Sequence, residues 1–367
     1  MKIIQIVPSL HMGGGEKFAV DLCNELIKLD HDVTLCVLGQ LDKSMRLVKM
    51  IDPKVKIISL EKKLGFDYQT FFKLYKCIKD INPDIVHMHL RSFTYSLLSM
   101  LLLKKQFIHT FHTLAEKETA GSMKRILYAF YFLKANVTPV SITSMVRKSV
   151  QKRFGNKYNV LITNGVSPLV VTDMFMPTKD EIDSYKYNKN TKVFINVARV
   201  TKVKNQELLI DTFKKLKEED INAILIIVGS LQNEKEYADS CLERASSMNN
   251  VFFLDEKENV SDYIACSDIF CLSSHFEGLP LTILESMSLG KPTLSTPVGG
   301  IPDVISNGYN GFLSKDNSLD AYVDTVKKSI TNKLLKEKDI IKLFEEKYSM
   351  VICANKYNKL YFDRVEQ

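Results

Sequence analysis

Apolar and polar residues alternate along the chain with two different periods, and that alternation predicts the fold class. Short apolar runs typical of buried strands are separated by segments in which apolar residues recur every three to four positions, for example 16–29 and 67–81. A repeated strand–helix order predicts a parallel sheet covered by helices, and hence an α/β protein. The first series of expected strands lies at 3–7, 33–38, 56–58, 85–89, 107–111 and 138–142.

A second series of strand-like runs follows, and the segment between the two series predicts a domain boundary. Residues 166–189 are polar and irregular and contain two prolines, which is typical of a linker. We therefore expect two Rossmann-like domains, at 1–165 and 190–340, and an amphipathic C-terminal helix at about 345–367 that returns to the first domain. The strands expected in the second domain lie at 192–196, 224–228, 251–254, 269–272, 292–295 and 311–313.

Composition and charge narrow the class of protein. The 367 residues suffice for two domains, and 45% hydrophobic with 25% charged residues is ordinary for a soluble protein. The net charge of +7 is too modest to indicate nucleic acid, but it suits an acidic substrate or an anionic membrane surface. Seven cysteines without metal-ligand spacing predict reduced thiols in a cytoplasmic protein.

The sequence contains neither a signal peptide pattern nor a spanning segment. The first residues are expected to form a strand. The longest apolar run, 95–103, is about half of the ~20 residues that a membrane-spanning helix needs. We expect a cytoplasmic protein, and peripheral contact with the inner face of the cell membrane is left open.

Residues 275–285, with the sequence HFEGLPLTILE, are the most informative stretch of the chain. A helix is expected to begin at Pro280, so Glu277 lies on the preceding loop and Glu285 lies within the helix. Free backbone amides at a helix start bind anions, and carboxylates bind hydroxyl groups. A nucleotide-sugar offers both kinds of group. The free amides expected here are those of Leu281 and Thr282.

Two other loops that follow strands carry groups suited to phosphate. Gly13-Gly14-Gly15 opens a helix, where glycine lets the backbone approach a ligand, although a tight strand-to-helix turn explains it equally well. This loop is not G-x-G-x-x-G and no acid ends the second strand, which argues against a dinucleotide. Arg199 and Lys204 share one loop. They could hold a diphosphate through charge-assisted hydrogen bonds worth about 1.5–3 kcal/mol each, or remain solvated.

Histidines and a basic segment complete the candidates. His112 follows the strand 107–111, whereas His109 is expected to be structural. Asp30-His31-Asp32 has the spacing of a metal site, but it precedes a strand at the wrong end of the sheet, so no metal is expected there. A basic series with interleaved aromatics over 124–153 is either one helix with a core stripe or a surface for anionic lipid.

These motifs together resemble those of the retaining glycosyltransferases of glycosyltransferase family 4, which have the GT-B fold. The resemblance covers nearly the whole chain. The chain departs from the family at two places. Asp255 stands where the family often has Gly, and Val228-Gly229-Ser230-Leu231 stands where the family often has Gly-x-Gly. The motifs that carry the resemblance are Gly13-Gly14-Gly15-Glu16, Phe111-His112-Thr113, Thr163-Asn164-Gly165-Val166, Ala198-Arg199 with Lys204-Asn205, Val228-Gly229-Ser230, Ser273-Ser274 with Glu277-x7-Glu285, and Gly299-Gly300-Ile301-Pro302-Asp303.

The resemblance implies a role for each matching residue, at a cleft faced by the sheets of both domains. The catalytic group would be His112, Glu277, Arg199 and Lys204, with the two cations neutralising the donor diphosphate in place of a metal and His112 hydrogen-bonding the donor sugar near its reacting carbon. Glu285 would hold the ribose, and Glu277 would contact the sugar. The donor-binding group would be Gly14, Gly15, Arg199, Lys204, Gly229, Ser230, Gly278, Leu279, Leu281, Thr282 and Glu285. On the acceptor side the expected residues are Gly13, His89 and Arg91.

The activity implied is retaining transfer of a hexose or N-acetylhexosamine from a nucleotide-diphosphate sugar, UDP before GDP. The acceptor would be a sugar hydroxyl of a polysaccharide or a polyprenyl-diphosphate-linked glycan, in bacterial O-antigen, capsule or exopolysaccharide synthesis. No cofactor, metal or nucleic acid is expected. The alternatives are a nucleotide-sugar 2-epimerase of the same fold and a non-catalytic nucleotide-sugar-binding subunit.

Overall fold

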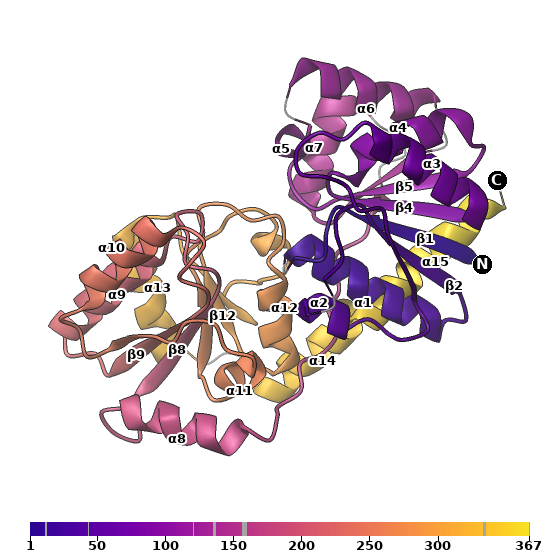
Figure 1. Cartoon of the computed structure of the whole chain (residues 1–367). Helices are drawn as coiled ribbons and strands as arrows, with labels where there is room; N and C mark the ends of the chain where they lie inside the picture. Colours follow the sequence, from indigo (N-terminus) through magenta and orange to yellow (C-terminus); the bar gives the residue numbers. More distant parts are fainter. Residues whose placement is uncertain are drawn as a thin grey trace. The chain divides into compact units, whose positions relative to one another are not determined.

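The computed structural model of the protein describes residues 1–11, 13–42, 44–119, 121–134, 137–155, 160–332 and 335–366. The chain divides into two compact units, one of Met1–Ser167 with Lys347–Gln367 and one of Pro168–Glu346. Each unit is a parallel sheet with helices on both faces (Figure 1). The expected pair of Rossmann-like domains is therefore present.

The first unit is built on a seven-stranded sheet in the order β3-β2-β1-β4-β5-β6-β7, with parallel pairings. Six of these strands match the expected ones within a residue or two. The two-residue edge strand β7 was not expected, because two residues give no readable apolar run. The strands are β1 (Lys2–Val7), β2 (Asp32–Val37), β3 (Lys56–Ser59), β4 (Ile85–His89), β5 (Gln106–Phe111), β6 (Val137–Ser141) and β7 (Val160–Leu161).

Helices cover both faces of this sheet, which is why its central strands are buried along almost their whole length. Helices α1 and α15 pack together on one face, and α3, α4, α6 and α7 line the other (Figure 1). The helices of the first unit are α1 (Gly14–Lys28), α2 (Arg46–Lys49), α3 (Gln69–Ile81), α4 (Ser92–Leu102), α5 (Ala115–Glu118), α6 (Ser122–Lys134), α7 (Ser144–Phe154) and α15 (Met350–Val365).

The C-terminal helix returns to the first unit, as expected, but the amphipathic end of the chain forms two helices. Helix α14 (Glu337–Lys347) ends before Ser349, whose Oγ caps α15 by accepting from the Ile352 amide at 3.4 Å. At this break Val166 exchanges backbone hydrogen bonds with Tyr348 and Met350, at 3.1 and 2.8 Å. These bonds tie α15 to the first unit.

The second unit has a six-stranded sheet in the order β10-β9-β8-β11-β12-β13, again with parallel pairings. Its core joins Phe194 and Leu225 of the sheet to Phe213 of α9 and Tyr322 of α13. The strands are β8 (Lys192–Val197), β9 (Ala223–Val228), β10 (Val251–Phe253), β11 (Ile269–Leu272), β12 (Thr293–Ser295) and β13 (Gly311–Leu313).

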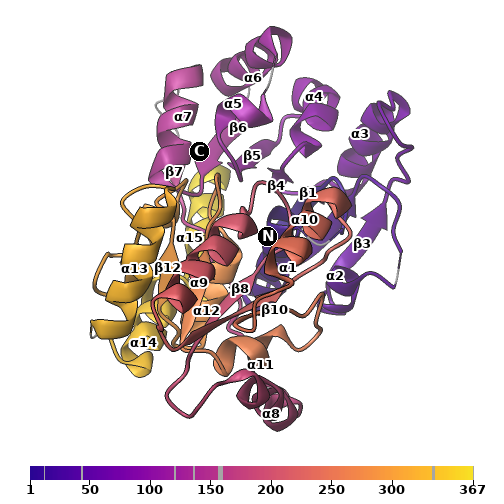
Figure 2. The same cartoon turned by 90° about the vertical axis from the view of Figure 1, so that its left-hand side faces the viewer.

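Around this sheet α9 packs beside α13, and α8 packs beside α11 (Figure 2). The helices of the second unit are α8 (Phe175–Tyr185), α9 (Gln206–Glu218), α10 (Lys235–Ala245), α11 (Val260–Ala265), α12 (Leu281–Ser288), the 3-10 turn η1 (Ile301–Asp303), α13 (Leu319–Thr331) and α14.

The segment 166–189 differs from the expected irregular linker, because most of it belongs to the second unit and contains α8. The Thr172 amide and hydroxyl both donate to the Asp262 carboxylate, at 2.7 and 2.6 Å. Only Thr178 and Ile182 of α8 are buried, so the sequence shows almost no apolar period. Pro177 lies in the first turn, where its missing N–H costs no hydrogen bond.

The strand order reverses at one point in each sheet, between β1 and β4 and between β8 and β11. Ligands of open parallel sheets bind beyond the carboxyl ends of the strands at such a point. The loops that follow these four strands carry most of the residues singled out from the sequence.

Candidate functional site

Arg199 and Lys204 lie on the loop between β8 and α9. Gln206 holds this loop, since its Nε2 donates to the Arg199 carbonyl at 3.1 Å and its Oε1 accepts from the Thr201 amide at 3.3 Å. The Arg199 guanidinium is exposed and has no partner among the residues that the structure describes. The loop thus presents one unpaired cation on a fixed backbone.

Lys204 and Glu277 form an ion pair that the sequence did not predict. The Lys204 Nζ lies 2.5 Å from the Glu277 Oε1, and the side chains are only 22% and 10% exposed. The same oxygen accepts from the Ser274 hydroxyl at 2.7 Å. Ser273 donates to the backbone carbonyls of Lys204 and Asn205, at 2.9 and 2.8 Å. The loops after β8 and β11 are therefore joined through charged and hydroxyl groups.

Two glycines allow the backbone of these loops to come close. Gly229 has φ +153°, and a Cβ there would lie 2.0 Å from the Ala198 carbonyl oxygen. Gly299 has φ +63°, and a Cβ there would lie 1.9 Å from the Glu277 carbonyl oxygen. Any other residue would displace the backbone next to Arg199 or at Glu277. The motif glycines thus fix the positions of the charged side chains.

Helix α12 begins at Leu281 and not at Pro280, which has extended backbone angles and occupies the N-cap. Within the described part of the chain, the amides of Leu281 and Thr282 have no acceptor. Glu285 lies one turn further along and is 9% exposed. Before the helix, Leu279 is buried and the Gly278 carbonyl accepts from the Gly300 amide at 2.7 Å. The start of α12 keeps two free donors, as expected.

Asp255 has a left-handed backbone conformation, which favours glycine. Its φ is +50°, which is uncommon for a residue with a side chain. Its carbonyl accepts from the Gly229 amide at 2.9 Å, and its Oδ1 accepts from the Leu231 amide at 3.4 Å. Ser230 in the same turn accepts from the Val200 amide at 3.0 Å.

In the first unit the glycine loop lies against the end of β4. Gly13 caps α1, Gly14 is exposed, and a Cβ on Gly15 would lie 2.9 Å from the Leu90 side chain. Leu90 itself has φ +55°, a strained value for leucine. Arg91 follows it and is exposed, and its guanidinium has no partner in the described ranges. The strain and the unpaired cation lie at the carboxyl end of β4.

His112 is half-buried at the end of a polar network whose other members are buried. Its Nε2 lies 3.1 Å from the Nδ1 of His89, whose Nε2 lies 2.7 Å from the Gln5 Oε1. The Gln5 Nε2 donates to the Tyr361 hydroxyl at 3.1 Å. That hydroxyl lies 2.7 Å from the Nδ1 of His87. His89, expected on the acceptor side, is fully buried with both ring nitrogens occupied. It therefore holds His112 and is not available to an acceptor.

Burial keeps these rings neutral. Desolvation lowers the pKa of His112 to about 3, and the neighbouring His109 lowers it further. Desolvation and the neighbouring histidines hold the pKa values of His87 and His89 well below the ordinary value. His112 is thus a hydrogen-bonding group and not a proton carrier near neutral pH.

Comparison with known families decides the class of protein. The model of the glycosyl transferases group 1 matches residues 177–344, and the model of glycosyltransferase family 4 matches residues 12–168. The chain is a family 4-type glycosyltransferase with the GT-B fold. The matched ranges cover the β8, β11 and α12 loops and the glycine loop with His112.

Named relatives of this glycosyltransferase are similar over most of their length. The UDP-Gal:α-D-GlcNAc-diphosphoundecaprenol α-1,3-galactosyltransferase of Escherichia coli is 24% identical, over 82% of this chain and 80% of its own. The N-acetyl-α-D-glucosaminyl L-malate synthase of Bacillus anthracis is 23% identical, over 96% and 94%. An uncharacterized glycosyltransferase of Methanocaldococcus jannaschii is 29% identical, over 61% of this chain and 58% of its own.

Solved structures share the fold. A glycosyltransferase from Rickettsia africae superposes with a TM-score of 0.85 at 20% identity, covering 100% of this chain and 99% of its own. HepE of Anabaena, solved with UDP and glucose, superposes with a TM-score of 0.80 at 15% identity, covering 99% and 100%.

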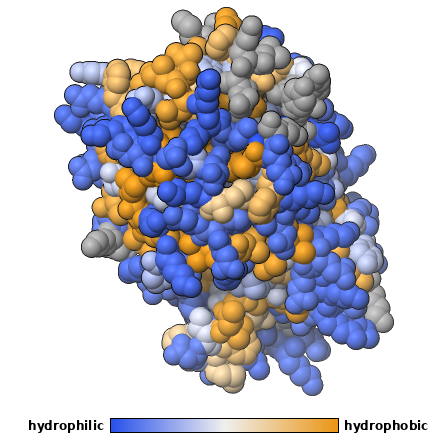
Figure 3. All heavy atoms as spheres, turned by 90° about the vertical axis from the view of Figure 1, so that its right-hand side faces the viewer, coloured by the Kyte–Doolittle hydropathy of each residue, from blue (hydrophilic) through white to orange (hydrophobic). Residues whose placement is uncertain are grey.

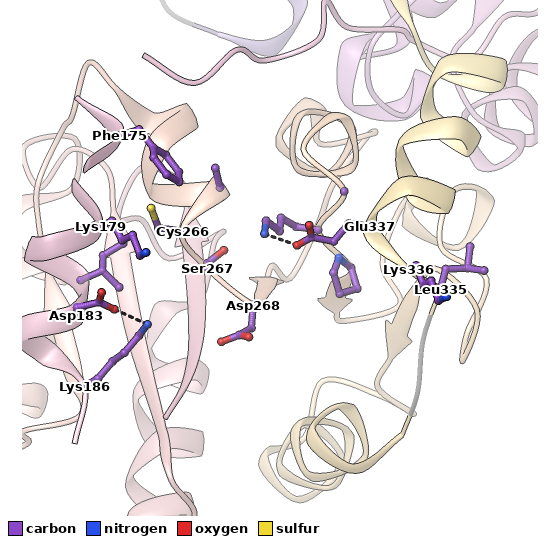
Figure 4. Close-up of a pocket in the computed structure, with 15 residues that line it drawn as sticks. Phe175, Lys179, Asp183, Lys186, Cys266, Ser267, Asp268, Leu335, Lys336 and Glu337 are labelled. Atoms are coloured by element: carbon purple, nitrogen blue, oxygen red, sulfur yellow. Dashed lines mark hydrogen bonds and ion pairs between the residues drawn. The ribbon is translucent and has the colours of Figure 1, made fainter. Parts of the chain in front are cut away.

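A cavity in the glycosyltransferase's second unit lies away from these loops. It measures about 490 Å³ and is bordered by α8, by the turns before β11 and β12, and by the start of α14. Figure 4 shows Lys179, Asp183 and Lys186 on one side and Glu337 on the other. Those turns are at the amino ends of the strands, so this cavity is not at the expected ligand-binding edge.

The remaining candidates from the sequence are the metal-like segment 30–32 and the basic series 124–153. His31 hydrogen-bonds Asn358 at 2.8 Å and Asp32 pairs with Lys56 at 2.8 Å. Among the described residues no three potential metal-ligating side chains gather at one point. The basic series 124–153 is not one helix, because β6 separates α6 from α7. The described helices include none that combines the length and apolar character needed to cross a bilayer.

Proposed function

We propose that this glycosyltransferase transfers a hexose or N-acetylhexosamine, with retention, from a UDP-sugar to a sugar hydroxyl of a lipid-linked or polysaccharide acceptor. The observation that carries the proposal is the arrangement at the β8–β11 switch point. An unpaired Arg199, a shielded Lys204–Glu277 pair and the free amides of α12 lie on loops at the same edge of one sheet. A sugar diphosphate matches these groups, with anions for the donors and hydroxyls for the carboxylate.

The proposed chemistry needs charge stabilisation and little else. The bond between the anomeric carbon and the diphosphate oxygen breaks, and the acceptor hydroxyl bonds to the same face of that carbon. Its proton passes to the departing diphosphate. Arg199 and Lys204 stabilise the charge that develops on the leaving oxygen, which lowers the barrier without a metal. Glu285 holds the ribose, and Glu277 holds the sugar.

The names of relatives support the donor and the acceptor. The E. coli relative uses UDP-Gal and a diphosphoundecaprenol-linked sugar. A relative from Campylobacter jejuni, 24% identical over 85% of this chain, is named as an N-acetylgalactosaminyltransferase acting on an undecaprenol-diphosphate-linked glycan. We extend a UDP-sugar and a polyprenyl-diphosphate-linked acceptor to this chain on that basis, in bacterial surface glycan synthesis.

The test is a thermal-shift panel of UDP, GDP, ADP, CMP and NAD with EDTA present. UDP at about 100 times its dissociation constant should stabilise the protein by roughly 2.7 kcal/mol. Glu285→Ala should abolish that shift, whereas Glu337→Ala, at the opposite end of the strands, should retain it. Product analysis by NMR of the anomeric proton should show retention. A UDP-sugar that is only epimerised, or bound without turnover, would replace the transferase by one of its alternatives.

We also propose that the helical layer of α3, α4 and α6 rests on an anionic membrane, where a lipid-linked acceptor would be found. Large apolar side chains are exposed on these helices and on the loop before α3. Figure 3 shows such side chains gathered among charged ones in its upper part. Phe66 is 76% exposed and Phe72 is 62% exposed, next to the exposed Lys63, Lys73 and Lys76. Aromatic and basic side chains together are typical of interfacial binding.

Vesicle flotation tests this surface. Binding to vesicles that contain the anionic lipid phosphatidylglycerol should fall several-fold in Phe66→Ser/Phe72→Ser. The matched control is Phe362→Ser, which removes another exposed phenylalanine, from α15. Equal loss in both variants, or no binding by the wild type, would remove the membrane from the proposal while leaving the transferase in place.

A further inference from the structure

Gln5 determines which groups donate and which accept hydrogen bonds in the polar network next to His112. An amide has an oxygen that can only accept and a nitrogen that can only donate. The Gln5 Oε1 faces the Nε2 of His89 at 2.7 Å, and the Gln5 Nε2 faces the Tyr361 hydroxyl at 3.1 Å. His89 must therefore carry its proton on Nε2 and donate it to Gln5.

The position of the proton on His89 determines the position of the proton on His112. His89 is fully buried and neutral, so a proton on its Nε2 leaves its Nδ1 as an acceptor. The Nδ1 lies 3.1 Å from the Nε2 of His112, which must then be the donor. A neutral His112 with its proton on Nε2 has a lone pair on Nδ1. No group in the described part of the structure bonds that Nδ1.

The far end of the network lies on the C-terminal helix. Tyr361 accepts from Gln5, and its hydroxyl lies 2.7 Å from the Nδ1 of His87, to which it can donate. The Nε2 of His87 then donates to the Thr110 hydroxyl at 2.8 Å. The four side chains from Gln5 through Tyr361 and His87 to Thr110 are buried, so water cannot exchange for any of these partners. Reversing one bond would require reversing its neighbours, which makes the direction cooperative.

We propose that Gln5 and Tyr361 are positioning residues that hold His112 as its Nε2–H tautomer, so that its Nδ1 accepts a hydrogen bond from a hydroxyl of the donor sugar. This deepens the proposed function and rests on it for the identity of the ligand. The His112 ring also packs against Phe18 in a T-shaped arrangement, with ring centroids 5.4 Å apart, which restricts the plane of the imidazole ring. The Nε2 of His112 therefore remains a donor, and its Nδ1 remains an acceptor, when the sugar binds.

The proposal has a consequence for specificity. An acceptor atom that cannot become a donor selects a hydroxyl at that position and disfavours a sugar that lacks it. A buried acceptor left without its donor costs about 1–3 kcal/mol. The deoxy analogue at the hydroxyl concerned should therefore be used about ten- to a hundredfold less efficiently than the parent sugar.

The experiment reads the tautomer directly. Protein labelled with ¹⁵N-histidine is examined by long-range ¹⁵N–¹H correlation, and the His112 signals are identified by their loss in His112→Gln. We expect a protonated Nε2 and an unprotonated Nδ1 from pH 8 to pH 5.5. A proton on Nδ1, or a cationic ring in this range, would overturn the proposal. Because the free protein is observed, this result does not depend on whether the transferase activity is found.

Variants separate positioning from simple destabilisation. Gln5→Leu and Tyr361→Phe should mix the two His112 tautomers and lower kcat by about tenfold with little change in UDP affinity. The matched control is Tyr131→Phe, which removes another buried tyrosine hydroxyl bond in the same unit, the one to the Leu97 carbonyl at 3.0 Å. That variant should leave the His112 spectrum unchanged. An unchanged spectrum in Gln5→Leu would refute the positioning role.

Discussion

The two units place their candidate residues at equivalent points of their sheets but use opposite physical means. Near the β1–β4 switch point, His112 ends a chain of neutral groups, mostly buried, in which each hydrogen bond joins a donor to an acceptor. Near the β8–β11 switch point, Lys204 and Glu277 are charged and satisfied by each other, and Arg199 has no partner among the described residues. One site is fixed by hydrogen-bond direction, and the other by charge.

The difference indicates what each site can adjust to. A neutral network in a dry interior changes only as a unit, because any unpaired member costs a full desolvation penalty. The Lys204–Glu277 ion pair, by contrast, can exchange one partner for a ligand anion that keeps the Lys204 charge paired. The second unit is therefore suited to a ligand whose charge changes during the reaction, and the first to a ligand recognised by its hydroxyl geometry.

Acidification should have the largest effect, because it should lower the stability of the first unit and not that of the second. Burial lowers the pKa values of His87 and His89 in the folded state, so below pH 6.5 the unfolded state binds protons that the folded state does not. Stability is thus complete above about pH 6.5 and falls as the pH drops below it. Each of these histidines contributes a slope of up to about 1.4 kcal/mol per pH unit.

Hydrogen exchange read by mass spectrometry can follow the two units separately. Peptides from β1, β4 and β5 should lose protection between pH 6.5 and pH 5, while peptides from β8 and β11 should not. The second unit provides the control, because His275 is the one histidine of the sequence within 168–346 and it is exposed. Equal loss in both units would show that the buried rings do not set the acid limit.

Removing the Lys204 cation should have the next largest effect, and it tests the charged site of the second unit. Lys204→Ala should lower kcat by about 10²–10³-fold, the usual cost of losing one group that stabilises the leaving charge. Steady-state kinetics with the donor identified by the thermal-shift panel would measure it. Lys291→Ala is the matched control, because Lys291 also pairs with a glutamate, Glu337, at 2.6 Å. A near-normal kcat for Lys204→Ala would assign the Lys204–Glu277 pair a structural role.

Neutralising the Glu277 carboxylate should test the same charged site and should have a smaller effect. Glu277→Gln frees Lys204 and removes a negative charge from the proposed diphosphate site, so UDP should bind about three- to tenfold more tightly. Turnover should fall, since the sugar loses a carboxylate partner. Calorimetry with UDP and kinetics with the sugar donor measure the two effects. Weaker UDP binding would mean that Glu277 supports the site rather than competing with the ligand.

The sequence predicted the fold well because its signals are local. Both parallel sheets follow from apolar runs separated by helical periods, and the strands match within a residue or two. What it missed is either short or non-local. The strand β7 has two residues, and α8 buries only two side chains.

For the candidate site, sequence motifs predicted which residues end strands but not how they pair. The partnership of Lys204 with Glu277 spans 73 positions, and that of Gln5 with Tyr361 spans 356. No periodicity encodes such distances. His89 illustrates the limit, because its place at a strand end suggested a ligand contact, whereas its side chain is enclosed by Gln5 and His112.

The smallest effect should come from Asp255, where backbone strain and a hydrogen bond oppose each other. Asp255→Gly relieves a left-handed φ of +50°, worth about 1 kcal/mol, but it removes the long 3.4 Å bond to the Leu231 amide. The net gain in unfolding free energy should be below about 1 kcal/mol, and UDP affinity should change less than threefold. Asp220→Gly, at another left-handed aspartate of the second unit, is the control for strain alone. If Asp255→Gly weakened UDP binding tenfold while Asp220→Gly did not, the Asp255 carboxylate would belong to the nucleotide site, and the charged character of the second unit would extend to the β9 turn.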